Sequence, residues 1–219
     1  MSFFTSRPKP SDGNEAPSTS DLRAACQTST SSDDLTRSLV HQEQSLLDAC
    51  AQNRRGGVEI STVLLAHLNP NIRYQPSNNF RRRPDGLGPS QHLLERAAFH
   101  ANTSLVRHLL STHPNLDIHS ETLGMHAFTG GVHVWAAIIE HEPGMKDMRY
   151  GHSGSVVEHA VKFRKVEVLR YVLEQGAKVE EDERPILQIA TIFEAGEEIE
   201  GVLKEFGADA RWREKEEGE

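Results

Sequence analysis

Histidine is the residue type with the most varied chemistry in this chain of 219 residues, which contains 12 histidines. Two histidines four residues apart on a helix, or a His-Glu-x-x-His motif, would predict a zinc site. Neither pattern occurs, because His92, His100 and His108 are eight residues apart and His141-Glu142 is followed by proline. The two cysteines form no Cys-x-x-Cys pair. We therefore expect no metal site and no cofactor, and we interpret the histidines as packing or surface residues.

The cysteines, Cys26 and Cys50, each follow an alanine in a short apolar stretch. A redox pair or half of a metal site is one interpretation of such residues. We favour the other one, in which they are small buried residues of two similar helices, since thiols in a reducing compartment rarely form disulfides.

Enzyme motifs are missing from the sequence. There is no Gly-x-Ser-x-Gly turn, no Gly-x-x-x-x-Gly-Lys phosphate loop and no Gly-x-Gly-x-x-Gly fingerprint. Serine, histidine and aspartate are all plentiful, so composition alone leaves a catalytic triad open. We assign no catalytic residue and predict a protein that is not an enzyme.

A basic and aromatic cluster is the most distinctive feature, and it lies in a segment punctuated by Pro, Asn and Gly, residues 69–90. Such a composition predicts a loop. Three interpretations are open: a contact for an acidic protein partner, a nuclear-import or phosphate-binding patch, and a solvated loop. We predict that the segment contacts a partner protein through Tyr74, Phe80, Arg81, Arg82 and Arg83.

The charge balance narrows the class of partner. The formal net charge is −8, and residues 180–219 contain 14 acidic but only 5 basic residues. This balance disfavours nucleic acid as the partner. No apolar run is long enough for a membrane span, and the N-terminus has no apolar signal region. We expect an intracellular protein, in the cytoplasm or the nucleus, with a disordered arm over residues 1–20.

Internal repetition is the strongest structural signal. Short apolar helices alternate in pairs, and the second helix of each pair is predicted to begin near residues 35, 60, 105, 134, 168 and 199. One pair shows its boundaries clearly. Ser155 and Glu158 form a capping box at the start of the first helix, and Gly176 is a left-handed cap at the end of the second. The last three steps between pairs are 29, 34 and 31 residues, close to a period of about 33.

These segments resemble the ankyrin-repeat family. The resemblance covers residues 21–211 and is strongest where Gly176-Ala177 and Gly207-Ala208-Asp209 match the family's Gly-Ala-Asp ending. The family's Thr-Pro-Leu-His tetrad is nowhere intact. The resemblance implies an all-α fold, an α-solenoid of about five helix-pair repeats. We expect a degenerate N-terminal cap over 21–44, the inserted loop 69–90 and a charged tail over 212–219.

The same resemblance implies a function. Ankyrin arrays recognise other proteins through a concave surface, with β-hairpin fingers formed by the connectors between repeats. The connector before Ser155 places Arg149, Tyr150 and His152 at such a finger. We therefore expect a monomeric, non-catalytic interaction module. The alternatives are a regulatory subunit or inhibitor of an enzyme or transcription factor, an enzyme on a repeat scaffold, and a factor associated with DNA or RNA.

Overall fold

The chain is all-α wherever its structure is described, in residues 32–74, 86–150, 154–179 and 184–208 of a computed structural model. These ranges contain no β-strand, but two isolated antiparallel bridges join Tyr74 to Leu87 and Arg149 to Ser155. No helix in them is long and apolar enough to cross a membrane. The elements are α2 (Ser32–Gln52), α3 (Gly57–His67), α4 (Pro89–Phe99), α5 (Thr103–Thr112), α6 (Glu121–Gly130), α7 (Val132–His141), the 3-10 helix η1 (Pro143–Asp147), α8 (Val156–Lys162), α9 (Val166–Glu174), α10 (Ile186–Ile192) and α11 (Glu197–Glu205).

Helix α2 corrects the predicted N-terminal cap. The sequence predicted a cap that ends at residue 44, with its second helix beginning near residue 35, but one continuous helix, Ser32–Gln52, extends past that boundary. Residues 41–45 include no proline or glycine, so nothing ends the helix there. The rest of the predicted cap, residues 21–31, lies outside the described residues.

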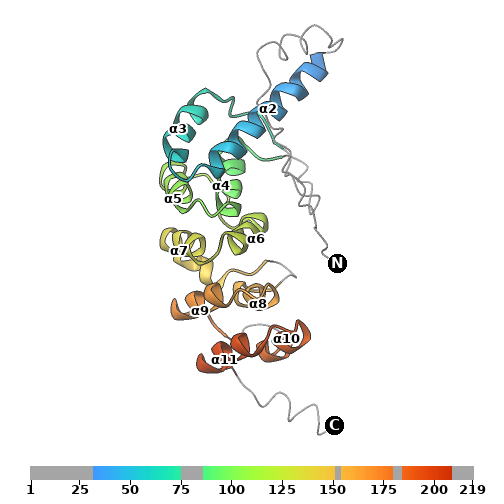
Figure 1. Cartoon of the computed structure of the whole chain (residues 1–219), viewed down its shortest axis with the longest axis vertical. Coiled ribbons are helices and arrows are strands. Elements are labelled where there is room, and N and C mark those ends of the chain that lie inside the picture. Colours follow the sequence, from blue (N-terminus) through green and yellow to red (C-terminus); the bar gives the residue numbers. More distant parts are fainter. Residues whose placement is uncertain (1–31, 75–85, 151–153, 180–183, 209–219) are drawn as a thin grey trace, which may run out of the picture. The chain divides into compact units, whose positions relative to one another are not determined.

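The chain divides into two compact units, Met1–Gln42 and Glu43–Glu219. The described part of the first unit is the beginning of α2. In the second unit, α4, α6, α8 and α10 begin at intervals of 32, 35 and 30 residues, and each is followed by a short turn and a second helix. The second helices form a row in which α3, α5, α7, α9 and α11 contact one another in order. Within the other row, α4 contacts α6 and α8 contacts α10 (Figure 1).

Side-chain caps explain where several helices begin. Ser155 accepts a hydrogen bond from the Glu158 backbone N–H at the start of α8, so the predicted capping residue is confirmed. Asn102 and Ser120 cap α5 and α6 in the same way. Each cap satisfies a backbone donor that has no partner within the helix, and so sets the first residue of the helix.

The ends of the helices repeat one backbone motif. At Gly176 and Gly207 the chain turns with positive φ, and paired backbone hydrogen bonds close a Schellman motif, as the sequence predicted for helix ends. The first helices of three pairs end in the same motif without glycine. The left-handed residues there are Ala101, Arg164 and Glu194, with φ of 56°, 53° and 48°.

The core lies between the two rows of helices. Trp135 is fully buried, and its ring lies 4.9 Å from that of Phe128. Gly130 lets α6 approach α4, because a Cβ there would collide with the Ala98 carbonyl. The fully buried large side chains are Trp135, Tyr74, Phe128, Leu47, Leu93, Leu94, Leu105, Leu109, Leu123, Ile138, Met145 and Leu169.

Candidate functional site

The long connector between α3 and α4 is closed at its base. Tyr74 and Leu87 exchange two backbone hydrogen bonds of 2.8 Å, and both side chains are buried. The Tyr74 hydroxyl donates to Glu43 Oε2 at 2.9 Å, and its ring lies 5.4 Å from that of His92. Burial and the Glu43 carboxylate raise the pKa of Tyr74, which therefore stays protonated. The connector is thus anchored to α2 and α4.

The connector between α7 and α8 is closed in a similar way. Tyr150 N–H donates to the Gly154 carbonyl at 3.0 Å, and Val156 N–H donates to the Met148 carbonyl at 3.0 Å. The Tyr150 ring meets His159 edge-on at 5.3 Å. Its hydroxyl occupies the space beside Gly124, where any side chain would collide with it. The hydroxyl is buried and has no hydrogen-bond partner among the described residues, and burial raises the pKa of Tyr150.

Two of the residues that were predicted to contact a partner are buried in these anchors. The sequence predicted that Tyr74 and Tyr150 contact a partner, but they are 0% and 5% exposed. The bridges turn both rings inward against histidines of α4 and α8, so neither ring is accessible. Arg149 is exposed as expected. Phe80, Arg81, Arg82, Arg83 and His152 lie outside the described residues.

The repeated order of the helices sets where the connectors lie. Each connector leads from a second helix to the beginning of the next first helix, so the described ends of the connectors lie along the edge formed by the N-termini of the first helices, the connector edge (Figure 1). The connector before α6 is fastened there too. The Gln91 amide donates to the Asp117 carbonyl at 3.2 Å and accepts from the Asp117 N–H at 2.8 Å. This connector edge contains the base of each bridged connector.

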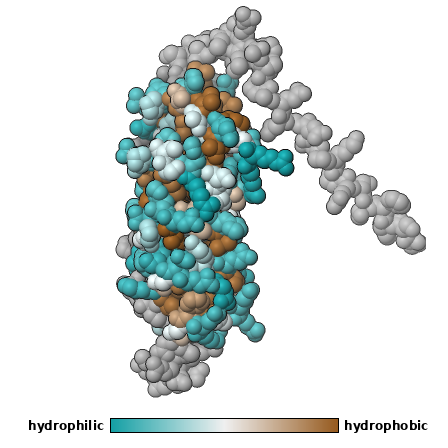
Figure 2. Space-filling view, turned by 90° about the vertical axis from the view of Figure 1, so that its left-hand side faces the viewer, coloured by the Kyte–Doolittle hydropathy of each residue, from teal (hydrophilic) through white to brown (hydrophobic). Residues whose placement is uncertain are grey.

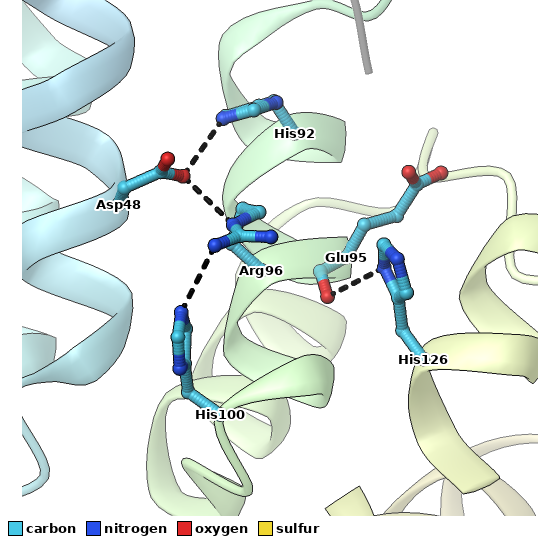
Figure 3. A network of polar contacts seen from close by, with 6 residues as sticks. All are labelled: Asp48, His92, Glu95, Arg96, His100 and His126. Carbon is cyan, nitrogen blue, oxygen red and sulfur yellow. Dashed lines mark hydrogen bonds and ion pairs between the residues drawn. The ribbon is translucent and has the colours of Figure 1, made fainter. Parts of the chain in front are cut away.

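A polar network crosses from α2 through α4 to α6 (Figure 3). Asp48 of α2 accepts from His92 at 3.2 Å and forms an ion pair with Arg96 Nε at 2.9 Å. Arg96 Nη2 lies 3.1 Å from His100 Nε2, so His100 accepts there and is neutral. His92 and Arg96 of α4 and His100, the residue that caps its C-terminus, follow one another at intervals of four residues, which puts them on one side of the helix.

The other half of the network joins α4 to α6. Glu95, which is 2% exposed, accepts from the Gln91 amide at 3.2 Å and from the Ser120 hydroxyl at 3.4 Å. His126 Nδ1 lies 3.1 Å from the Glu95 backbone carbonyl, so this nitrogen carries the proton and donates. The buried carboxylate and the buried imidazole thereby have partners on the neighbouring repeat.

Burial and charge set the protonation of these groups. Burial, and after it the positive charge of Arg96, lowers the pKa of His126 to about 4. Burial and Arg96 also lower the pKa of His100. Burial alone would raise the pKa of Asp48, but the hydrogen bond from His92 and the charge of Arg96 keep it below its ordinary value. At neutral pH, His100 and His126 are therefore neutral and Asp48 is charged.

The network is suited to holding helices in register rather than to acid–base catalysis. His126 is 5% exposed and its pKa is far below neutrality, whereas a general base needs access to substrate and a pKa near the working pH. A hydroxyl does meet an imidazole where Thr62 Oγ1 lies 3.3 Å from His108 Nε2. The Thr62 proton is donated to the Val58 carbonyl at 2.9 Å, so His108 is the donor in this contact and does not activate the hydroxyl.

The sequence contained a signal for half of this network. His92, Arg96 and His100 recur every four residues, a spacing that marks one side of a helix, whereas we considered only the eight-residue spacing of the histidines. Asp48 and His126 could not have been paired with them, because they lie 44 residues before His92 and 26 residues after His100 in the chain.

We find no further candidate site among the described residues, and comparison with known proteins indicates none. Among the described residues, no three His, Cys, Asp or Glu side chains are grouped so that they could hold a metal ion. Comparisons with protein-family models, with curated proteins and with solved structures found no match to this chain.

Proposed function

We propose that this chain is a non-catalytic protein-recognition module built from ankyrin-like repeats, and that it binds a partner protein at the connector edge. The observation that carries the proposal is the anchoring of two connectors. Each is closed by an antiparallel bridge, and each bridge is fixed by a buried tyrosine against a histidine of the next first helix. Connector ends that are already held in place need no ordering when a partner binds, which reduces the entropic cost of association.

The regular packing of the helix pairs supports the same function. Because each pair contacts its neighbours, the pairs together present a continuous surface that no single pair could hold in place. Several polar side chains inside the stack join neighbouring repeats, as Asp48, His92 and His126 do, while connector residues such as Arg149 are exposed where a partner can reach them. Arginine is enriched among residues that dominate binding energy.

Affinity capture of the tagged full chain from its native cell extract tests the proposal. Wild type is compared with a variant in which Phe80, Arg81, Arg82 and Arg83 are all alanine, and bound proteins are identified by mass spectrometry. The matched control replaces Arg107 and Arg170, which are exposed on α5 and α9 and pair with Glu140 and Glu205. We expect a partner that the control retains and the loop variant loses.

Two further results bear on the connector edge. A partner retained by the loop variant but lost in Arg149→Ala would move the contact to the connector before α8. A partner lost equally in the control would place the contact on the row of second helices and contradict the proposal. The absence of any reproducible partner would also contradict it.

A further inference from the structure

Helix α3 buries two small residues and exposes two large apolar ones. The residues that it buries are Gly57 and Ser61, whereas Ile60 is 43% exposed and Val63 is 60% exposed. A Cβ at Gly57 would lie 2.9 Å from the Cys50 carbonyl, so no larger residue fits at that position, and Val58, Leu64 and Leu65 are only half-buried. A helix at the surface of a soluble protein usually buries its large apolar residues instead. The outer face of α3 therefore has the character of an interface.

The opposite end of the same row is different. Helix α11 exposes mainly charged side chains, among them Glu197, Glu198, Lys204 and Glu205. Repeat arrays end in helices with a polar outer surface, which keeps the array soluble, and α11 fits that description. Figure 2, which faces this row, shows an apolar patch at the α3 end and further apolar areas lower along the row. The charged outer surface of α11 suits a terminal repeat, whereas α3 exposes Ile60 and Val63.

We propose that the outer face of α3 is the interface of a homodimer, in which α3 packs antiparallel against α3 of a second copy. A two-fold axis at Val63 places Ile60 opposite Ala66 of the second copy, so a large side chain meets a small one. The same register places Glu59 opposite His67, and these are the only ionisable residues of α3. Both are exposed, and a carboxylate facing an imidazole can form a hydrogen bond.

The side-chain contacts of α3 are compatible with this register. His67 Nδ1 lies 2.8 Å from the Val63 carbonyl of its own helix, which leaves Nε2 for the second copy. Thr62 lies 3.3 Å from His108 of α5 and so marks the side of α3 that faces its own chain. Residues 59, 60, 63, 66 and 67 follow the spacing of one helix face, as in an antiparallel helix pair.

The size of the face predicts a weak dimer. Helix α3 has 11 residues and is about 16 Å long, so one helix covers less than the ~800 Å² per partner of a stable interface. We therefore expect a dimer that forms at micromolar or higher concentration. The full chain has a mass of 24.4 kDa, so dimerisation is readily seen by sedimentation.

Analytical ultracentrifugation from about 1 µM to about 500 µM covers the range of such interfaces. We expect the mass of the wild-type chain to rise from 24.4 kDa towards twice that value. Val63→Arg should weaken association by at least ~10-fold, because it places two like charges at the axis. Ile192→Arg is the matched control, since Ile192 is 55% exposed on α10, and it should associate like wild type. Circular dichroism shows whether each variant is folded.

Cross-linking tests the register itself. In a Cys26→Ser background, Val63→Cys should form an intermolecular disulfide with oxidised glutathione as the oxidant, because the two thiols meet at the axis. Thr62→Cys lies on the same helix but faces α5, and it should not cross-link. Glu59→Arg should weaken the dimer, and adding His67→Glu should restore it. A wild-type chain that remains monomeric, a Val63→Arg variant that dimerises like wild type, or equal cross-linking through residue 62 would each overturn the proposal.

Discussion

The contacts around α4 and those around α10 hold neighbouring repeats together by different means. The residues that α4 buries include His92 and Glu95, and its neighbours contribute Asp48 and His126. The residues that α10 buries are all apolar, namely Ile186, Leu187, Ile189 and Ala190. Apolar contacts depend mainly on volume, whereas hydrogen bonds are directional and depend on protonation. The difference teaches that one fold can combine a region sensitive to pH with a region that is not.

The largest loss of stability should come from truncating a buried leucine, and it should be similar in the two regions. Leu109 is fully buried, and Leu109→Ala should lower the free energy of unfolding by ~2–5 kcal/mol because it leaves a cavity. Leu187→Ala in α10 is the counterpart, and we expect a loss in the same range. Urea denaturation measures both. A loss below ~0.5 kcal/mol at Leu109 would contradict its place in the core.

Lowering the pH should destabilise the region around α4 more than the region around α10. The pKa of His126 is about 4 in the folded chain and 6.5 in its ordinary state, so between these values the unfolded chain binds more protons. Stability should therefore fall as pH decreases from 6.5 to 4, by up to about 3 kcal/mol from this residue. Burial also lowers the pKa of His100 and of His159, which adds to the same trend.

Urea denaturation at pH 7.5 and pH 4.5 measures the fall, and hydrogen exchange locates it. Residues 186–208 contain no histidine, so exchange in α4 and α6 should accelerate more than exchange in α10 and α11. His126→Gln keeps an N–H that can reach the Glu95 carbonyl but does not titrate. The pH dependence should be smaller in this variant, and an unchanged dependence would exclude His126 as its cause.

Breaking one ion pair in each region should have a smaller effect. Arg96→Met leaves Asp48 partly buried without its cation, and we expect a loss of ~1–2 kcal/mol. The pair of Arg170 with Glu205 is exposed, so Glu205→Gln should cost less than ~1 kcal/mol. Denaturation at low and high salt distinguishes them, since only the exposed pair should be strongly screened. Equal losses would contradict the contrast between the regions.

The smallest effect concerns the shared turn. Ala101 adopts a φ of 56°, which suits glycine better than a residue with a Cβ. Ala101→Gly should raise the free energy of unfolding by ~0.5–1 kcal/mol. Glu194→Gly, at the corresponding turn after α10, should do the same, because the turn geometry does not depend on whether the interface is polar. Destabilisation at either site would show that the turn is not strained.

The sequence predicted the local features of the fold well. The cap at Ser155, the helix ends at Gly176 and Gly207 and the burial of Cys50 are confirmed. Each of these depends on residues close together in the chain or on the apolar pattern of one helix. The continuity of α2 was missed because a gap between two apolar clusters was interpreted as a boundary, although the gap is itself compatible with helix.

The candidate site was harder to predict because its contacts are distant in sequence. The burial of Tyr74 depends on Glu43, 31 residues earlier, and on His92 in the next helix. The burial of Tyr150 depends on the missing side chain at Gly124. Basic and aromatic composition indicates a contact surface equally well for exposed and anchored residues. Only the arrangement of the helices shows which tyrosines hold the connectors in place.

The bridge between Tyr74 and Leu87 has a consequence for engineering. It fixes the two ends of the connector to the stack, and the free energy of closing a loop grows only slowly with loop length. The residues between the two bridge positions can therefore be exchanged or lengthened with little change in the stability of the helices. This connector is a natural acceptor site for grafted peptides, in which new binding sequences could be displayed on an unaltered scaffold.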